Sequence, residues 1–160
     1  MEPLKVVAQL WERIEARDWG GVAGLVAEDA VIEWPVSGER IVGRANFIAV
    51  LSDEDDGTDA GTGPDGAVGT AGTVGTAGTV GVERSIGSVE VLRILADGDL
   101  VVTEVEIPED HVLYRAVSLW TVRDGVIVGA REYWTSPGQD PAPRWRAGYV
   151  EPLAEPLVAD

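Results

Sequence analysis

The sequence predicts an α+β fold in which three helices near the start of the chain pack on a curved antiparallel sheet. Apolar residues recur at helical spacing over residues 4–28. Residues 86–135 instead form a succession of strand-like segments, interrupted by Asp97-Gly98 and Asp124-Gly125. Asp-Gly between apolar runs is a strong hairpin signal. Helices that precede a set of antiparallel strands are expected to cover one face of the sheet.

The helical part begins with five apolar residues on one face of a helix predicted over residues 4–16: Leu4, Val7, Ala8, Trp11 and Ile14. Asp18 is placed to cap a second helix over residues 19–28. Three glycines weaken that helix, so packing must hold it. A short strand is expected over residues 31–34 and a third helix over residues 44–51.

The second half predicts a meander of four strands, over residues 86–95, 99–107, 112–122 and 126–135. A Pro-Glu-Asp turn joins the two hairpins. The last segment, residues 136–160, contains five prolines. Because proline lacks an N–H and disfavours helix and sheet interiors, we expect an extended arm here rather than a further element.

Residues 52–82 differ from the rest, with six Asp or Glu, no Lys or Arg, and no aromatic residue. The hexamer GTAGTV occurs at 69–74 and 75–80, after a degenerate copy at 63–68. One interpretation is a hexapeptide β-helix, but three hexads make only about one coil, and solenoids need about three or more repeats. The preferred interpretation is a flexible low-complexity loop.

The chain is therefore expected to be one domain over residues 1–151, interrupted by 52–82 and followed by a tail at 152–160. A length of 160 residues suits a single core. If the insert is a surface loop, deleting residues 53–81 should leave folding intact. If it instead tethers partners, the same deletion should abolish association.

Composition excludes several classes of function. The formal net charge of −16 disfavours nucleic acid and anionic membranes as partners. There is no Cys, and His111 is the only His, so thiolate and multi-histidine metal sites are not expected. The start of the chain lacks a signal-peptide pattern, and no run of about 18 apolar residues suggests a membrane span. A cytoplasmic protein without a cofactor is expected.

Several segments, in this order, resemble SnoaL-like domains of the nuclear transport factor 2-like superfamily, in an uncharacterised bacterial branch. They are Ala16-Arg17-Asp18-Trp19, Glu33-Trp34-Pro35, Gly43-Arg44-Ala45-Asn46, Asp124-Gly125-Val126-Ile127, Arg131-Glu132-Tyr133-Trp134 and Pro143-Arg144-Trp145-Arg146. The resemblance implies a cone-shaped domain with an apolar pocket, and a homodimer formed through the convex sheet face. The superfamily includes polyketide cyclases, ketosteroid isomerase, scytalone dehydratase and limonene epoxide hydrolase, besides proteins that only bind, so fold leaves function open.

The resemblance further implies a catalytic carboxylate on the late strands. Glu104, Glu106 and Glu132 are the candidates. Glu104 and Glu106 share one strand face with apolar residues, which is unusual for a solvated face. Burial would raise their pKa towards the range useful for proton transfer. The alternative is that these carboxylates face solvent and pair with Arg115 or Arg131.

Other residues complete the candidate site. His111 lies beside a turn and is either a surface residue or a group at the pocket mouth. Large apolar side chains are expected in the core or as a wall against a flat, hydrophobic small molecule: Trp11, Ile14, Trp34, Trp120 and Trp134. Epoxide hydrolysis is doubtful, because Glu104 stands where limonene epoxide hydrolase has an Arg between two acids. Ketosteroid isomerase needs a Tyr from the first helix, where this chain has Trp11. A cofactor-independent cyclase, isomerase or hydrolase and a non-catalytic ligand-binding or dimerisation domain remain the alternatives.

Overall fold

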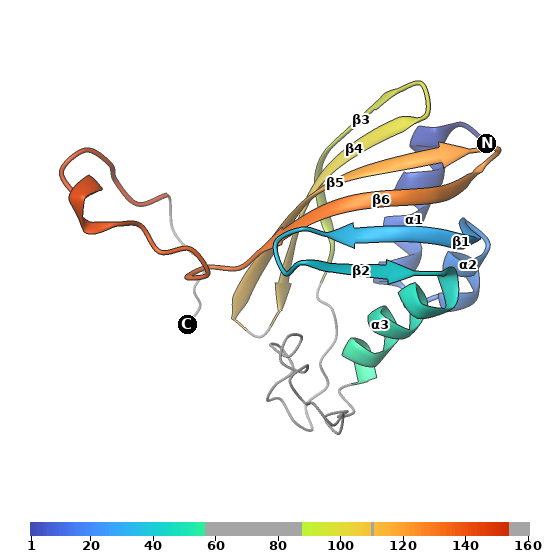
Figure 1. Ribbon diagram of the computed structural model, residues 1–160, viewed down its shortest axis with the longest axis horizontal. Coiled ribbons are helices and arrows are strands. Elements are labelled where there is room, and N and C mark those ends of the chain that lie inside the picture. Colours follow the sequence, from blue (N-terminus) through green and yellow to red (C-terminus); the bar gives the residue numbers. More distant parts are fainter. Residues whose placement is uncertain (57–87, 110, 154–160) are drawn as a thin grey trace.

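Helices cover one face of a six-stranded sheet (Figure 1). The computed structural model describes residues 1–56, 88–109 and 111–153. The helices are α1 (Pro3–Glu15), α2 (Trp19–Ala23) and α3 (Arg44–Asp56). The strands are β1 (Val26–Trp34), β2 (Glu39–Val42), β3 (Glu90–Asp97), β4 (Leu100–Glu109), β5 (Val112–Arg123) and β6 (Val126–Thr135). The predicted α+β class is confirmed.

Helix α1 forms where the apolar spacing predicts it. Pro3 occupies the first turn, where its missing N–H costs nothing. The buried face consists of Val6, Val7, Leu10, Trp11 and Ile14. This face contacts strands β3 to β6, so α1 forms one wall of the core.

The second helix is shorter than predicted. Asp18 caps it as expected, with its Oδ1 accepting the Gly21 N–H at 2.9 Å. The helix nevertheless ends at Ala23, and Val26 to Glu28 belong to β1 instead of to the predicted helix over 19–28. The glycines make helix continuation costly, whereas pairing with β6 buries Val26 and joins the Leu25 carbonyl to the Ile127 N–H at 2.8 Å.

The sheet has the order β2-β1-β6-β5-β4-β3. Strands β3 to β6 form the predicted antiparallel meander. Strand β1, however, runs parallel to β6, so the sheet is mixed and not purely antiparallel as predicted. This pairing places the end of β1, at Trp34, beside the second half of β6, where the candidate site lies.

Helix α3 continues to Asp56, five residues into the predicted loop over 52–82. The rest of that segment, with all three hexamers, lies outside the described residues. Beyond β6 the described part of the predicted arm, residues 136–153, is less extended than expected: a hydrogen-bonded turn runs from Ser136 to Gln139, and a 3-10 helix at Arg144–Arg146 leads into a second turn that ends at Tyr149. None of the described helices is long and apolar enough to cross a membrane.

Candidate functional site

A row of polar side chains crosses the otherwise apolar core. Among the described residues, the buried polar or charged side chains are Thr103, Ser118 and Glu132. They come from β4, β5 and β6, and the strand register places Thr103 opposite Ser118 and Ser118 opposite Glu132. A buried polar side chain is costly unless it is hydrogen-bonded, so their alignment across three strands marks this row as the candidate site.

Glu132 lies at one end of this row and is only 3% exposed. Its Oε1 accepts the indole N–H of Trp34 at 2.9 Å and that of Trp134 at 3.4 Å. Its Oε2 lies 2.9 Å from the hydroxyl oxygen of Ser118. Indole nitrogens only donate, whereas a hydroxyl either donates or accepts. Oε1 is therefore held as an acceptor, while Oε2 can exist with or without a proton.

Burial raises the pKa of Glu132 above its ordinary value, because desolvation penalises the carboxylate. The hydrogen bonds from Trp34, Ser118 and Trp134 act in the opposite direction and lower it. None of the ion pairs among the described residues involves Glu132. This combination favours the protonated form of the carboxyl group more than solvent does, as a group that takes up and returns a proton requires.

The other end of the row is held by two further tryptophans. Thr103 Oγ1 accepts the indole N–H of Trp120 at 3.0 Å and that of Trp11 at 3.4 Å. The Trp11 ring packs edge-on against Trp120 and Trp134, with centroids 5.9 and 6.4 Å apart. The predicted aromatic residues thus gather along the row, and Ile14 is buried in the same core. The polar row and these tryptophans are called the Glu132 site below.

The structure corrects the expected placement of Glu104 and Glu106. Along β4 the buried positions alternate with theirs, so both glutamates point away from the core and the helices. Glu104 pairs with Arg93 at 2.8 Å and Glu106 with Arg115 at 3.0 Å. They lie on the opposite sheet face from Glu132 because neighbouring residues of a strand face opposite ways and the register fixes which face is buried.

His111 is exposed, in the turn between β4 and β5, with a positive φ of 69°. It is not part of the Glu132 site. In the part of the chain that the structure describes, no group of three His, Asp or Glu side chains is arranged to hold a metal ion. Ser118 and Thr103 were missed as site residues by the sequence analysis. One sequence pattern could have identified them: each is a small polar residue in a strand, and its neighbours two residues away on either side are apolar.

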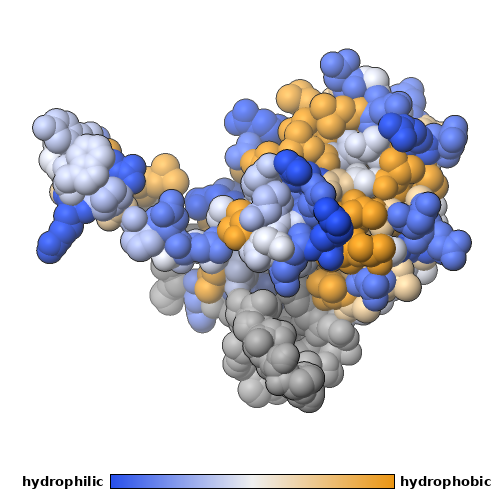
Figure 2. All heavy atoms as spheres, in the orientation of Figure 1, coloured by the Kyte–Doolittle hydropathy of each residue, from blue (hydrophilic) through white to orange (hydrophobic). Residues whose placement is uncertain are grey.

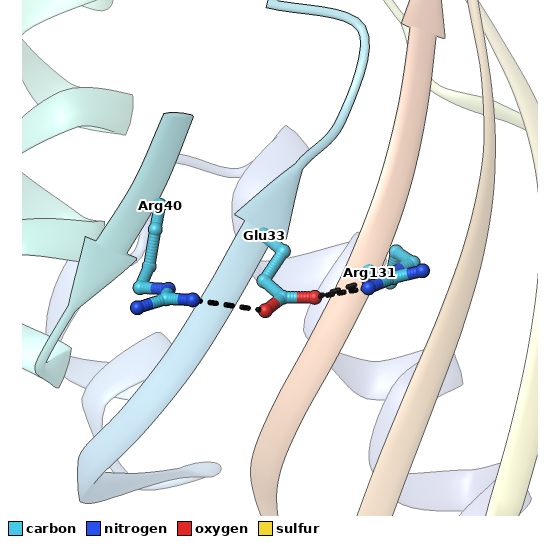
Figure 3. Close-up of polar contacts among 3 residues, drawn as sticks. All are labelled: Glu33, Arg40 and Arg131. Carbon is cyan, nitrogen blue, oxygen red and sulfur yellow. Dashed lines mark hydrogen bonds and ion pairs between the residues drawn. The ribbon is translucent and has the colours of Figure 1, made fainter. Parts of the chain in front are cut away.

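Charged residues of β1, β2 and β6 meet on the outer sheet face. Glu33 accepts two hydrogen bonds from Arg131, at 3.0 and 2.8 Å, and pairs with Arg40 at 3.5 Å (Figure 3). Arg131, and then Arg40, lower the pKa of Glu33. An open depression of about 380 Å³ adjoins these residues. Glu33, the acid beside this depression, is already paired with Arg131 and Arg40, and its pKa is lowered. The depression therefore lacks the proton-transfer chemistry of Glu132.

Comparisons with known proteins support the fold. No family model matches the chain, and no curated protein matches it. Among solved structures, it is similar to an NTF2-like protein of unknown function from Burkholderia xenovorans LB400, with 25% identity, 94% of each chain covered and a TM-score of 0.60. It is also similar to a candidate ketosteroid isomerase from Kribbella flavida DSM 17836, with 20% identity, 96% of this chain and 90% of the other covered, and a TM-score of 0.66.

A third similar structure is IdmH, a candidate polyketide cyclase from Streptomyces antibioticus, with 19% identity, 84% of this chain and 92% of the other covered, and a TM-score of 0.59. These proteins share helices packed on a curved sheet, the arrangement that places Glu132 in the core. The chain thus has the NTF2-like fold that these solved structures represent.

Proposed function

We propose that the protein is a cofactor-independent enzyme in which Glu132 moves a proton on a hydrophobic, carbonyl-bearing small molecule. The observation that carries the proposal is the burial of Glu132 among three hydrogen-bond partners that hold no formal charge. A carboxyl group in such surroundings is a better base at neutral pH than a solvated one, because its pKa is raised.

The arrangement suggests how one carboxyl group performs both proton steps. As a base, the carboxylate takes a proton from the α-carbon of a carbonyl compound with a C=C bond between its β- and γ-carbons, and the electron pair of that C–H bond moves into a dienolate. The protonated Glu132 then returns the proton to the γ-carbon and the C=C bond moves to the α,β position, which completes an isomerisation without a change in oxidation state. Trp34 and Trp134 hold Oε1 throughout, and rotation of the Ser118 hydroxyl lets it donate to the carboxylate and accept from the acid.

Two of the structural neighbours are candidate enzymes, which supports a catalytic role but does not identify the reaction of this chain. Besides a candidate ketosteroid isomerase and a candidate polyketide cyclase, they include an epoxide hydrolase of Mycobacterium tuberculosis, 20% identical with a TM-score of 0.57. Epoxide hydrolysis has less support here. Glu106 and Arg131 face outwards, so neither provides the second acid or the guanidinium beside Glu132.

A non-catalytic binding domain is the second candidate. It is favoured by the character of the site, in which the indole N–H groups of Trp34 and Trp134 reach Glu132 and those of Trp11 and Trp120 reach Thr103, so that Glu132 is the one titratable side chain of the Glu132 site. In this case the carboxyl would only orient a ligand through a hydrogen bond.

Exchange of carbon-bound hydrogen distinguishes the two candidates. Acetophenone and cyclohexanone, incubated in D₂O with the protein, should lose α-proton NMR signal faster than in buffer alone. Glu132→Gln should abolish the acceleration, while Glu106→Gln, on the outer face, serves as the matched control and should retain it. Acceleration that survives in Glu132→Gln contradicts the proposed base. No acceleration, together with a ligand that co-purifies in native mass spectrometry, supports the binding domain.

A further inference from the structure

Thr103 carries a fully buried hydroxyl group whose two acceptor positions are both in use. Its Oγ1 accepts the indole N–H of Trp120 at 3.0 Å and that of Trp11 at 3.4 Å. A threonine hydroxyl has two lone pairs that accept and one O–H group that donates. Because both lone pairs are engaged, Thr103 can meet a further polar group only as a hydrogen-bond donor.

No acceptor for this O–H group comes from the part of the chain that the structure describes. None of the hydrogen bonds among those residues has the Thr103 hydroxyl as its donor. Ser118 lies directly opposite Thr103 in the strand register, but its own hydroxyl is engaged with Glu132 at 2.9 Å. A buried donor without an acceptor is costly and rare. The Thr103 hydroxyl therefore indicates that an oxygen acceptor binds at this end of the row.

The strand register sets the spacing between this donor and the base proposed above. Thr103 lies on β4 and Glu132 on β6, with Ser118 of β5 between them. Neighbouring strands are about 4.8 Å apart, so the two backbones are separated by about 10 Å. A carbonyl oxygen hydrogen-bonded to Thr103 and an α-carbon within reacting distance of Glu132 together need about 8 Å. One carbonyl group with its α-carbon thus has the right length to join the two side chains across the small Ser118.

The tryptophans of the Glu132 site determine which way a ligand would lie. Trp34 and Trp134 flank Glu132 and are partly exposed, whereas the two tryptophans beside Thr103 are buried. All four indole N–H groups already donate to Glu132 or Thr103, so the rings offer a ligand only apolar surface. On the surface of the protein, by contrast, hydrophilic groups are spread among hydrophobic ones (Figure 2). A ligand would therefore point its oxygen inwards and leave an apolar skeleton among the rings.

We propose that Thr103 is a further catalytic residue, whose hydroxyl donates a hydrogen bond to the carbonyl oxygen of the substrate. This inference rests on the proton transfer proposed for Glu132. When Glu132 takes the α-proton, the electron pair of the C–H bond moves into the dienolate, and negative charge develops on the oxygen beside Thr103. Thr103 keeps its own proton and stabilises this charge in a site that excludes water. The substrate class that suits the row is a β,γ-unsaturated ketone with one carbonyl group and an otherwise apolar skeleton.

The conversion of cyclohex-3-enone to cyclohex-2-enone, followed by the ultraviolet absorbance of the conjugated product, tests this role. Thr103→Val should lower kcat about 10²–10³-fold. KM should change little, because the donor acts mainly on the charged transition state. Thr103→Ser keeps the hydroxyl and should retain most of the rate. Thr121→Val, which replaces an outward-facing threonine of β5, is the matched control and should react like the wild type.

The carbonyl carbon of a bound ketone reports the hydrogen bond without depending on reaction rates or on a variant. Cyclohexanone labelled with ¹³C at this carbon is titrated with the protein. A ketone that leaves water for an apolar site loses its hydrogen bonds, and its carbonyl resonance moves upfield unless the protein supplies a donor. In the wild type and in Glu132→Gln the resonance of the bound ketone should stay near its value in water, and in folded Thr103→Val it should move upfield. An upfield shift in the wild type overturns the role of Thr103.

The possible outcomes separate this inference from the proposed function. Turnover that is lost in Glu132→Gln but unchanged in Thr103→Val refutes the role of Thr103 and leaves the base intact. A wild type that does not accelerate the isomerisation refutes the proton transfer, and the role of Thr103 with it. Slower turnover in Thr103→Val supports the proposal when the bound carbonyl is hydrogen-bonded only in the proteins that keep the hydroxyl.

Discussion

Replacing Glu132 with Gln removes a buried charge while preserving the hydrogen bonds of the side chain. The Gln oxygen can accept both indole N–H groups that Oε1 accepts, and its NH₂ can donate to Ser118. The variant therefore differs from the wild type mainly in its inability to ionise. We expect the two proteins to be about equally stable below pH 4.5, the ordinary pKa of Glu, where both side chains are neutral.

Above this pH the two stabilities should separate. The folded-state pKa of Glu132 is raised, so the folded protein binds its proton more tightly than the unfolded chain does. The stability that this proton provides is complete below pH 4.5 and is lost as the pH rises through the folded-state pKa. Within that window the free energy of unfolding of the wild type should fall relative to Glu132→Gln by up to about 1.4 kcal/mol per pH unit.

Urea unfolding of both proteins at intervals from pH 4 to pH 8 measures this difference. The gap should widen with pH and become constant above the folded-state pKa. Glu132→Leu serves as the contrast, because it also removes the charge but leaves the Trp34 N–H without its acceptor. It should therefore be about 1–3 kcal/mol less stable than Glu132→Gln. Parallel stability curves for the wild type and Glu132→Gln across the whole range would refute a raised pKa.

Two further substitutions test the surroundings of the site. Thr103→Val keeps the side-chain shape but leaves the buried indole N–H groups of Trp11 and Trp120 without an acceptor, so we expect a loss of about 2–4 kcal/mol in urea unfolding. Thr103→Ser should retain most of the stability, and a neutral effect of Thr103→Val would contradict the role of the hydroxyl. Asp18→Ala should lower the melting temperature at pH 7 by removing the cap of α2 and the pair with Arg13, while Asp18→Asn keeps the cap. Because Arg13, and then Gly21, lower the pKa of Asp18, the part of the loss that comes from the charge should be complete above pH 3.8, the ordinary Asp value, and should fade as the pH falls through the folded-state pKa. A loss that is constant with pH would exclude the charge as its cause.

The elements with strong local signals were predictable. The apolar face of α1 and the Asp-Gly hairpins depend on spacing and turn chemistry within a few residues. The Asp124-Gly125 turn indeed has φ of 50° and 78°, the left-handed conformation that this pair favours. The start of β1 was not predictable in this way. The apolar spacing of the residues before Val26 predicts a helix. Val26 is part of a strand only because it pairs in parallel with β6, about a hundred residues later in the chain.

The site shows the same division between local and long-range information. That Glu132 shares a strand face with Trp134 follows from the two-residue period. The two-residue period does not say which face of β4 is buried, because both faces contain apolar and polar residues. One face carries Val101, Thr103 and Val105, and the other carries Val102, Glu104 and Glu106. Packing against α1 buries the first set. The bond from Trp34 to Glu132 likewise depends on β1 lying beside β6.

A ¹³C NMR titration of the Glu132 side-chain carboxyl tests the central claim most directly. Comparison with Glu132→Gln assigns the signal. If Glu132 is the buried acid of a proton-transfer site, its resonance should titrate clearly above pH 4.5, the ordinary Glu value. A carboxyl that titrates at or below that value would contradict the account.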